Sequence, residues 1–91
     1  SSDLSIIAIS VINNNELEHE IKNIFFEVFP ELNESNFNWN KHQKEYVNWD
    51  SFAQLHIVSL AEAKFNITLS IDETTSITSA QDLLQQVKSH L

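Results

Sequence analysis

The sequence predicts a small all-α protein, a four-helix bundle with a long loop between its first two helices and a short third helix. Three segments repeat apolar residues at intervals of three and four, which is the spacing of one face of a helix. Residues that end helices, Pro30 and Asn66, and residues that cap helix starts, Asp50 and Ser79, separate these segments. With 91 residues, 42% of them hydrophobic, the chain can form one domain around a single modest core.

The first helix is expected from about Asn15 to Phe29, because Pro30 cannot continue a helix. Its core face should consist of the apolar residues that recur at helical spacing, Leu17, Ile21, Ile24, Phe25 and Val28. Phe26 and Phe29 fall outside this stripe, so we expect them to cover the next loop or to stay partly exposed.

The segment from Glu31 to Trp49 is rich in asparagine and is expected to form a long loop. Large apolar side chains should anchor this loop to the helices, because such side chains bury much surface. The expected anchors are Phe37, Trp39, Tyr46 and Val47. We therefore expect an ordered loop rather than a disordered one.

The second helix is expected to begin at Ser51, with Asp50 as its N-cap, and to end at Asn66. Asparagine tolerates the left-handed conformation that usually requires glycine, and the chain has no glycine. The residues assigned to the core are Ile57, Val58, Leu60, Ala61 and Phe65. The residues assigned to a surface beside Ser51 are Phe52, Leu55, His56, Ser59 and Ala63. A second arrangement, in which Phe52 and Leu55 pack beneath the preceding loop, also fits the pattern.

Two further helices complete the predicted bundle. A short helical turn is expected near Asp72 to Ser76. The last helix should begin at Ser79, which is spaced from Asp82 as in a capping box. Its apolar stripe is expected to be Ala80, Leu83, Leu84, Val87 and Leu91.

The composition disfavours several classes of function. A formal charge of −8, with five lysines and no arginine, argues against nucleic-acid binding, which needs basic side chains at the phosphates. A basic partner surface is the better electrostatic match. No cysteine is present and the histidines are scattered (His19, His42, His56 and His90), so we expect neither a disulfide nor a metal site. No apolar run reaches the ~20 residues of a membrane span, and we expect a cytoplasmic protein.

The tetrapeptide Trp49-Asp50-Ser51-Phe52 precedes an apolar-rich stretch from Ala53 to Phe65. Within it, Asp50-Ser51-Phe52 is similar to the Asp-Ser-Leu motif of acyl and peptidyl carrier proteins. The likeness continues downstream through Leu55, Ile57, Val58, Ala61, Phe65-Asn66-Ile67, Leu69, Asp72-Glu73, Ile77-Thr78-Ser79 and Gln81-Asp82. The resemblance extends over roughly residues 14 to 91.

This resemblance implies the acyl-carrier type of bundle and a covalent attachment at Ser51. In the family, a separate phosphopantetheinyl transferase, with Mg²⁺, moves a 4′-phosphopantetheine arm from coenzyme A to the serine. The thiol of the arm then carries acyl groups as thioesters to acyl-loading, ketosynthase, condensation or acyltransferase-type enzymes. Asp50 would cap the helix and help to orient the transferase and its metal. The free N–H groups and the dipole of a helix start favour a phosphate group at this position.

Partner contacts are expected on the surface beside Ser51, at Phe52, Leu55, His56, Ser59 and Glu62. Only Asp50 and Glu62 are acidic in this stretch, whereas carriers of primary fatty-acid synthesis resemble one another in an acidic second helix. We therefore expect a specialised polyketide, nonribosomal peptide or related acyl pathway, whose partners recognise shape and apolar surface more than charge. Phe52, in place of the leucine of the family, adds bulk beside the arm.

Residues 1–13 are interpreted as an apolar leader or a docking arm, and residues 14–91 as the carrier domain, which we expect to be monomeric. No catalytic residue is expected, since a hydrolase needs a positioned base and the chain has no Gly-x-Ser-x-Gly elbow. The alternative function is a non-catalytic helical interaction module that keeps the carrier shape without the arm.

Overall fold

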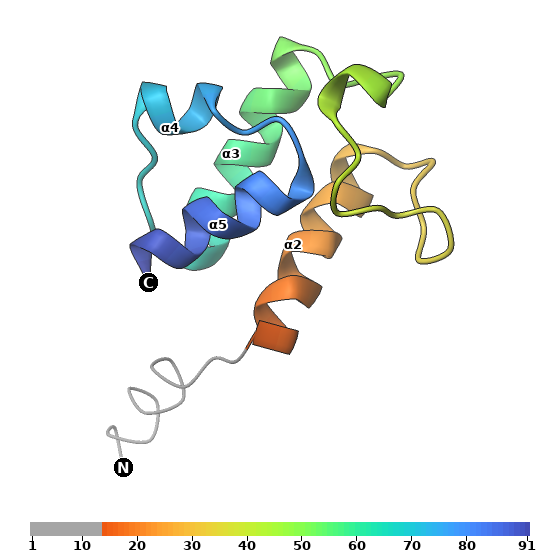
Figure 1. The fold of residues 1–91 in the computed structure, drawn as a ribbon. Coiled ribbons are helices and arrows are strands. Elements are labelled where there is room, and N and C mark those ends of the chain that lie inside the picture. The colour runs from red at the N-terminus through yellow and green to blue at the C-terminus, as the bar shows by residue number, and fades with distance from the viewer. Residues whose placement is uncertain (1–13) are drawn as a thin grey trace.

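The computed structural model describes residues 14–91, and every regular element in this part of the chain is a helix (Figure 1). In chain order the elements are α2 (Asn14–Val28), the 3₁₀ turn η1 (Gln43–Glu45), α3 (Ser51–Phe65), α4 (Ile71–Thr75) and α5 (Ala80–His90). The predicted all-α class, the long loop after the first helix and the short third helix are confirmed. The predicted leader or docking arm, residues 1–13, lies outside the described residues.

Helix α2 packs against both α3 and α5 (Figure 1). Its predicted core residues are buried with one exception, Val28, which is partly buried; the buried ones are Leu17, Ile21, Ile24 and Phe25. Phe29 is fully buried, which corrects its predicted place outside the core. Its backbone N–H donates to the carbonyl oxygen of Phe25 at 2.8 Å. Because the chain makes this extra helical hydrogen bond after α2, the Phe29 ring points into the core.

An aromatic cluster, defined as Phe25, Phe29, Tyr46 and Trp49, joins α2 to the loop and to the residues that precede α3. The ring centroids lie 4.8 Å apart for Phe29 and Tyr46, and 5.0 Å apart for Tyr46 and Trp49. Those of Phe25 and Trp49 are 5.5 Å apart. Tilted and edge-on pairs at such distances attract each other beyond the effect of burial alone. The loop is therefore ordered by burial of its own aromatic residues, as predicted for Tyr46.

The other predicted loop anchors behave differently from one another. Phe37 and Trp39 are partly buried against the core, with ring centroids 5.0 Å apart. Val47 is 92% exposed, so its prediction as an anchor is wrong. Its neighbour Tyr46 takes the buried position, because the larger ring fits against Phe29.

Backbone hydrogen bonds attach the loop to the last part of the bundle. The N–H of Gln43, in η1, donates to the carbonyl oxygen of Thr78 at 2.7 Å. The N–H of Gln81, in the first turn of α5, donates to the carbonyl oxygen of Trp39 at 3.0 Å. These bonds satisfy a helix-terminal donor and fix the loop beside α5.

The helix boundaries follow the predicted caps closely. Helix α3 ends at Phe65, and the φ of 55° at Asn66 confirms this residue as the predicted left-handed cap. Helix α4 begins after Ser70, which forms a reciprocal capping box with Glu73. Helix α5 begins after Ser79, as predicted, and the Ser79 hydroxyl accepts from the N–H of Asp82 at 3.2 Å.

The predicted capping box of α5 is only half present. The Asp82 carboxylate accepts from the N–H and the hydroxyl of Thr78, at 3.0 and 2.8 Å, instead of from the N–H of Ser79. The predicted apolar stripe is buried at Ala80, Leu83, Leu84 and Val87. Leu91 is exposed, because it follows the last residue of α5, so its prediction as a core residue is wrong.

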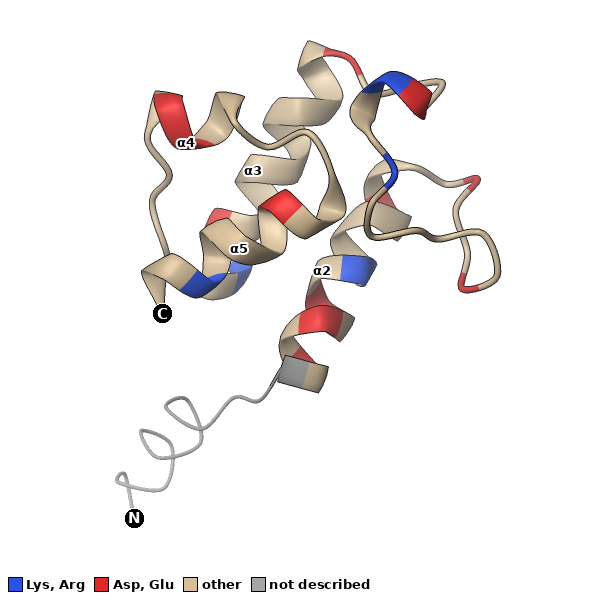
Figure 2. Ribbon diagram, in the orientation of Figure 1, with Lys and Arg blue, Asp and Glu red and all other residues tan. Residues whose placement is uncertain are grey.

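Charges are distributed unevenly over the described residues. Figure 2 shows acidic residues along α2, in α4 and in the loop, with only scattered lysines. Lys64 lies 3.6 Å from Glu20 and links α3 to α2, but exposed pairs of this kind contribute little to stability. None of the described helices is both long and apolar enough to cross a bilayer.

Candidate functional site

The first turn of α3 presents Ser51 to solvent. Asp50 adopts an extended backbone conformation, and its Oδ1 accepts from the N–H of Ala53 at 2.9 Å, which confirms it as the N-cap. Ser51 is therefore the first helical residue, and its side chain is exposed. Its hydroxyl makes no hydrogen bond to any other residue in the range 14–91.

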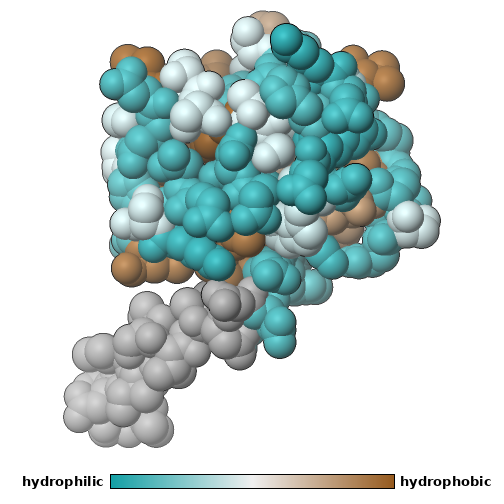
Figure 3. All heavy atoms as spheres, in the orientation of Figure 1, coloured by the Kyte–Doolittle hydropathy of each residue, from teal (hydrophilic) through white to brown (hydrophobic). Residues whose placement is uncertain are grey.

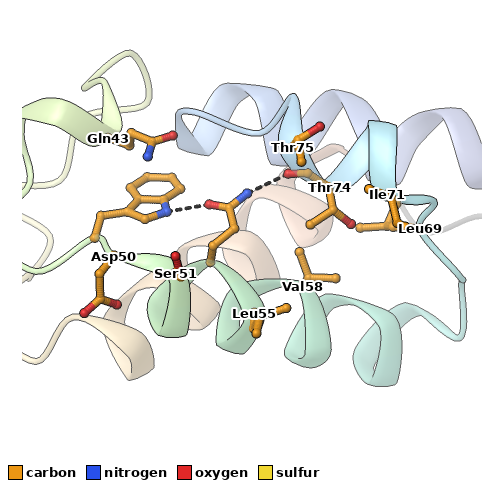
Figure 4. A pocket seen from close by; sticks show the side chains of 11 residues that line it. Gln43, Asp50, Ser51, Leu55, Val58, Leu69, Ile71, Thr74 and Thr75 are labelled. Atoms are coloured by element: carbon orange, nitrogen blue, oxygen red, sulfur yellow. Dashed lines mark hydrogen bonds between the residues drawn. The ribbon is translucent and has the colours of Figure 1, made fainter.

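A groove of about 750 Å³ runs between α3 and α4, with Ser51 at one end (Figure 4). The volume falls within the range of about 300–1,000 Å³ that is usual for ligand sites. The groove is lined by Gln43, Trp49, Asp50, Ser51, Gln54, Leu55, Val58, Leu69, Ile71, Thr74 and Thr75. The fold thus brings residues from the loop, α3 and α4 together beside the serine.

The two ends of the groove differ in chemistry. The end farther from Ser51 is mostly apolar, with Val58, Leu69 and Ile71 around it and Thr74 beside them (Figure 4). The end near Ser51 carries neutral polar groups of Gln43 and Gln54 and the indole N–H of Trp49. Asp50 is the only ionisable residue among the described lining residues, and its carboxylate points away from Gln54 and α4. The groove is therefore lined almost entirely by uncharged groups.

Gln54, in α3, hydrogen-bonds to α4 and to the residues that follow it. Its Oε1 accepts from the indole N–H of Trp49, and its Nε2 donates to the carbonyl oxygens of Thr74 at 2.6 Å and Ile77 at 3.1 Å. Sequence reasoning missed this residue, because a glutamine three positions after Ser51 looks like an ordinary surface residue. Its one signal is its position, since residues 51, 54, 55 and 58 follow one face of a helix.

The surface predicted beside Ser51 is exposed. Phe52 and Leu55 are 82% and 60% exposed, so the arrangement in which they pack beneath the loop is wrong. His56 and Ser59 are exposed as well. Figure 3 shows that the visible face of the molecule is mostly hydrophilic, with hydrophobic patches near its corners, one of them over α4. Ile71, the first residue of α4, is 83% exposed.

The core face of α3 differs from its prediction at three positions. Ile57, Val58 and Ala61 are buried as predicted, whereas Leu60 and Phe65 are only partly buried. Ala53 is buried in addition. Its small side chain faces the core directly after the cap, where the helix approaches the rest of the bundle.

Two residues predicted to bind partners have contacts inside the domain. His56 Nε2 lies 3.9 Å from Glu27 Oε2 of α2, although both side chains are at least half exposed. Glu62 is partly buried, and its Oε2 accepts from the backbone N–H of Leu69 at 2.8 Å. Glu62 thus hydrogen-bonds to the segment between α3 and α4, whereas Phe52 is exposed.

Two ionisable groups have shifted pKa values. The pKa of Glu73 lies below its ordinary value, first because its carboxylate accepts from the backbone N–H of Ser70 and second because it contacts His90. The Nε2 of His90 lies 2.9 Å from the Glu73 carboxylate. Burial raises the pKa of Tyr46 to about 12, and the negative charge of Glu45 adds to this. Neither group faces the Ser51 hydroxyl within hydrogen-bonding distance.

No cluster of three or more metal-binding side chains occurs among residues 14–91. Comparisons with protein-family models, with curated proteins and with solved structures find no match to this chain. The function must therefore be inferred from the residues of the site themselves.

Proposed function

We propose that the protein is a carrier of the acyl-carrier type, which holds a 4′-phosphopantetheine arm on Ser51. The observation that carries this proposal is the exposed Ser51 hydroxyl at the first position of α3, at one end of the groove. The dipole and the free N–H groups of a helix start favour a phosphate at that position. An arm attached there would lie next to the groove, and the exposed Phe52 is the following residue in the chain.

The attachment requires only a nucleophilic hydroxyl from this chain. The Ser51 oxygen would form a bond to the phosphorus of the phosphopantetheine moiety of coenzyme A, the pyrophosphate bond would break, and adenosine 3′,5′-bisphosphate would leave. The hydroxyl proton would pass to a base of the transferase, because no described residue hydrogen-bonds to the Ser51 hydroxyl. Once attached, the arm supplies a thiol that carries acyl groups as thioesters. The chain then acts as a tether, which raises the effective concentration of the acyl group at each partner.

The partners of such a carrier would meet Phe52 and Leu55 next to the arm. These two side chains are the large exposed apolar residues of α3, and anchors of this kind dominate binding energies in protein interfaces. Transferases and acyl-loading, ketosynthase, condensation or acyltransferase-type enzymes of a specialised pathway are the proposed partners. Surface carboxylates on α2 and α4 would favour basic rims on these partners.

Intact mass spectrometry tests this function after incubation with coenzyme A, Mg²⁺ and a promiscuous phosphopantetheinyl transferase. We expect one phosphopantetheine increment on the wild-type chain and none on Ser51→Ala. Ser89→Ala is the matched control, since Ser89 is an exposed helical serine of α5, outside the surface beside Ser51, and this variant should accept the full increment. If several transferases add no mass to the folded wild-type chain, the carrier function is contradicted and an interaction module without an arm is favoured.

A further inference from the structure

Helix α4 forms one wall of the groove without contributing a buried side chain. It has five residues, all of them described, and none is buried. A helix of this length is not stable alone, because nucleation is costly and few hydrogen bonds repay it. The apolar anchors lie just outside it, at the buried residues Leu69 and Ile77. The position of α4 therefore depends on contacts made by other parts of the chain.

Gln54 supplies the contact to α4 from the side of the groove. Among the described residues, it is the only α3 side chain that hydrogen-bonds to the segment 70–77. Its donors reach the carbonyl oxygens of Thr74 and Ile77, which lie 20 and 23 residues farther along the chain. Its acceptor is occupied by the indole N–H of Trp49. The three bonds use both donors and the acceptor of one amide, and they join three separate segments.

The contacts from α5 reach α4 on its other side. His90 meets Glu73 at 2.9 Å, and Gln86 Nε2 donates to the Ser76 hydroxyl at 3.2 Å. These contacts hold α4 to α5, but they do not fix its distance from α3. That distance is the width of the groove beside Ser51.

We propose that Gln54 is a positioning residue that fixes α4 against α3 and thereby sets the width of the groove beside Ser51. Its relevance to a group carried by Ser51 rests on the proposed function, whereas the positioning itself does not. A carboxylate of the same shape would keep the acceptor for Trp49 but would face the carbonyl oxygens of Thr74 and Ile77 without a donor. Gln54→Glu thus removes the hydrogen bonds to Thr74 and Ile77 and keeps the one to Trp49.

The test is amide hydrogen exchange followed by two-dimensional NMR on the full chain without an arm. In Gln54→Glu we expect exchange at the N–H groups of Thr74, Ser76 and Ile77 to accelerate by about tenfold or more, since two hydrogen bonds are lost. Exchange in α2 and α5 should be unchanged. Gln85→Glu is the control, because it adds the same charge at an exposed position of α5 and should leave α4 unaffected.

The two tryptophan indoles give a second readout. In Gln54→Glu the indole N–H signal of Trp49 should keep its protection, because an acceptor remains. In Gln54→Leu this protection should be lost together with that of α4. The indole of Trp39 should stay unchanged in both variants, because Gln54 Oε1 accepts from the indole of Trp49.

Several results would overturn the proposal. Unchanged exchange in α4 in both variants would show that other contacts position it. Acceleration of equal size in α2, α4 and α5 would show a general loss of stability rather than local positioning. If Gln54→Glu does not fold, amide exchange of α4 in Gln54→Leu, which adds no charge, decides whether Gln54 positions this helix. Both variants keep Ser51 and Asp50, so acceptance of the arm by either one is a separate result that bears only on the proposed function.

Discussion

Helix α2 contributes Ile21, Ile24 and Phe25 to the core as almost completely buried side chains, whereas α4 contributes none from the described chain. Helix α2 is held in place by the apolar surface that it removes from water. Helix α4 is held by directional hydrogen bonds from Gln54 and by the contact of Glu73 with His90. The difference separates the part of the domain that supplies stability from the part that forms a site. A wall held by a few polar contacts can move without unfolding the core.

The largest expected effect of a substitution lies on the α2 side. Phe25→Ala should lower the free energy of unfolding by about 3–5 kcal/mol, because it opens a cavity in the aromatic cluster. Urea denaturation followed by circular dichroism measures this value. Phe52→Ala is the matched control, and it should change stability by less than about 0.5 kcal/mol because Phe52 is exposed. Equal losses in the two variants would contradict the division between core and site.

The N-cap of α3 should contribute less to the free energy of unfolding than the core residue Phe25. Asp50→Ala removes the acceptor for the N–H of Ala53 and should cost about 1 kcal/mol of stability. Asp50→Asn keeps an acceptor oxygen and should retain most of the stability in the same denaturation experiment. If Asn proves as damaging as Ala, the negative charge rather than the hydrogen bond holds the helix start.

Tyr46 tests whether the aromatic cluster contains a buried polar group without a hydrogen-bond partner. Its hydroxyl is buried and has no hydrogen-bond partner among residues 14–91. Tyr46→Phe should therefore leave stability at neutral pH unchanged or raise it by up to about 1 kcal/mol, as measured by urea denaturation. A loss of more than this amount would show that the hydroxyl has a stabilising partner.

The raised pKa of Tyr46 also predicts a loss of stability in alkali. The pKa of Tyr46 is about 12 in the folded protein and 10.0 ordinarily, so folding favours the neutral phenol. This contribution is complete below pH 10.0 and is lost as the pH rises toward about 12, because the unfolded chain ionises first. Tyr46 is the only tyrosine, so phenolate absorbance reports it alone. Ionisation at the ordinary pH without unfolding would contradict the buried position.

The smallest effect is expected at α4. The pKa of Glu73 is lowered, so its carboxylate stabilises the fold at pH above its ordinary value of 4.5, and the contribution disappears as the pH falls below that value. Thermal unfolding between pH 6 and about 3 should therefore depend less on pH in Glu73→Gln than in the wild type. Because the group is exposed, the difference should be small beside that of Phe25→Ala. Identical pH profiles would show that ionisation of Glu73 contributes nothing to stability, through either Ser70 or His90.

The sequence predicted the features that depend on local chemistry. The caps at Asp50, Asn66 and Ser79 follow from residue type and from the next few positions, and the structure confirms them. The buried stripe of α5 follows from helical spacing up to Val87. The prediction of Leu91 as a core residue was wrong, because helical spacing alone does not show where the helix ends.

Features that depend on distant contacts were not predictable in this way. Tyr46 and Val47 are neighbours in the loop, and Tyr46 is the buried one because its ring packs against Phe25, Phe29 and Trp49, which are distant or separate in the sequence pattern. Gln54 acquires its role from carbonyl groups at Thr74 and Ile77, which local pattern does not reveal.

Attachment of a phosphopantetheine arm to Ser51 is tested most directly by peptide mass spectrometry of the transferase-treated chain. Trypsin cleaves after Lys44 and Lys64, so one peptide, residues 45–64, holds both Ser51 and Ser59. We predict that this peptide gains one phosphopantetheine and that fragment ions place it on Ser51. An unmodified peptide, or a modification located on Ser59, would contradict the assignment of Ser51 as the attachment point.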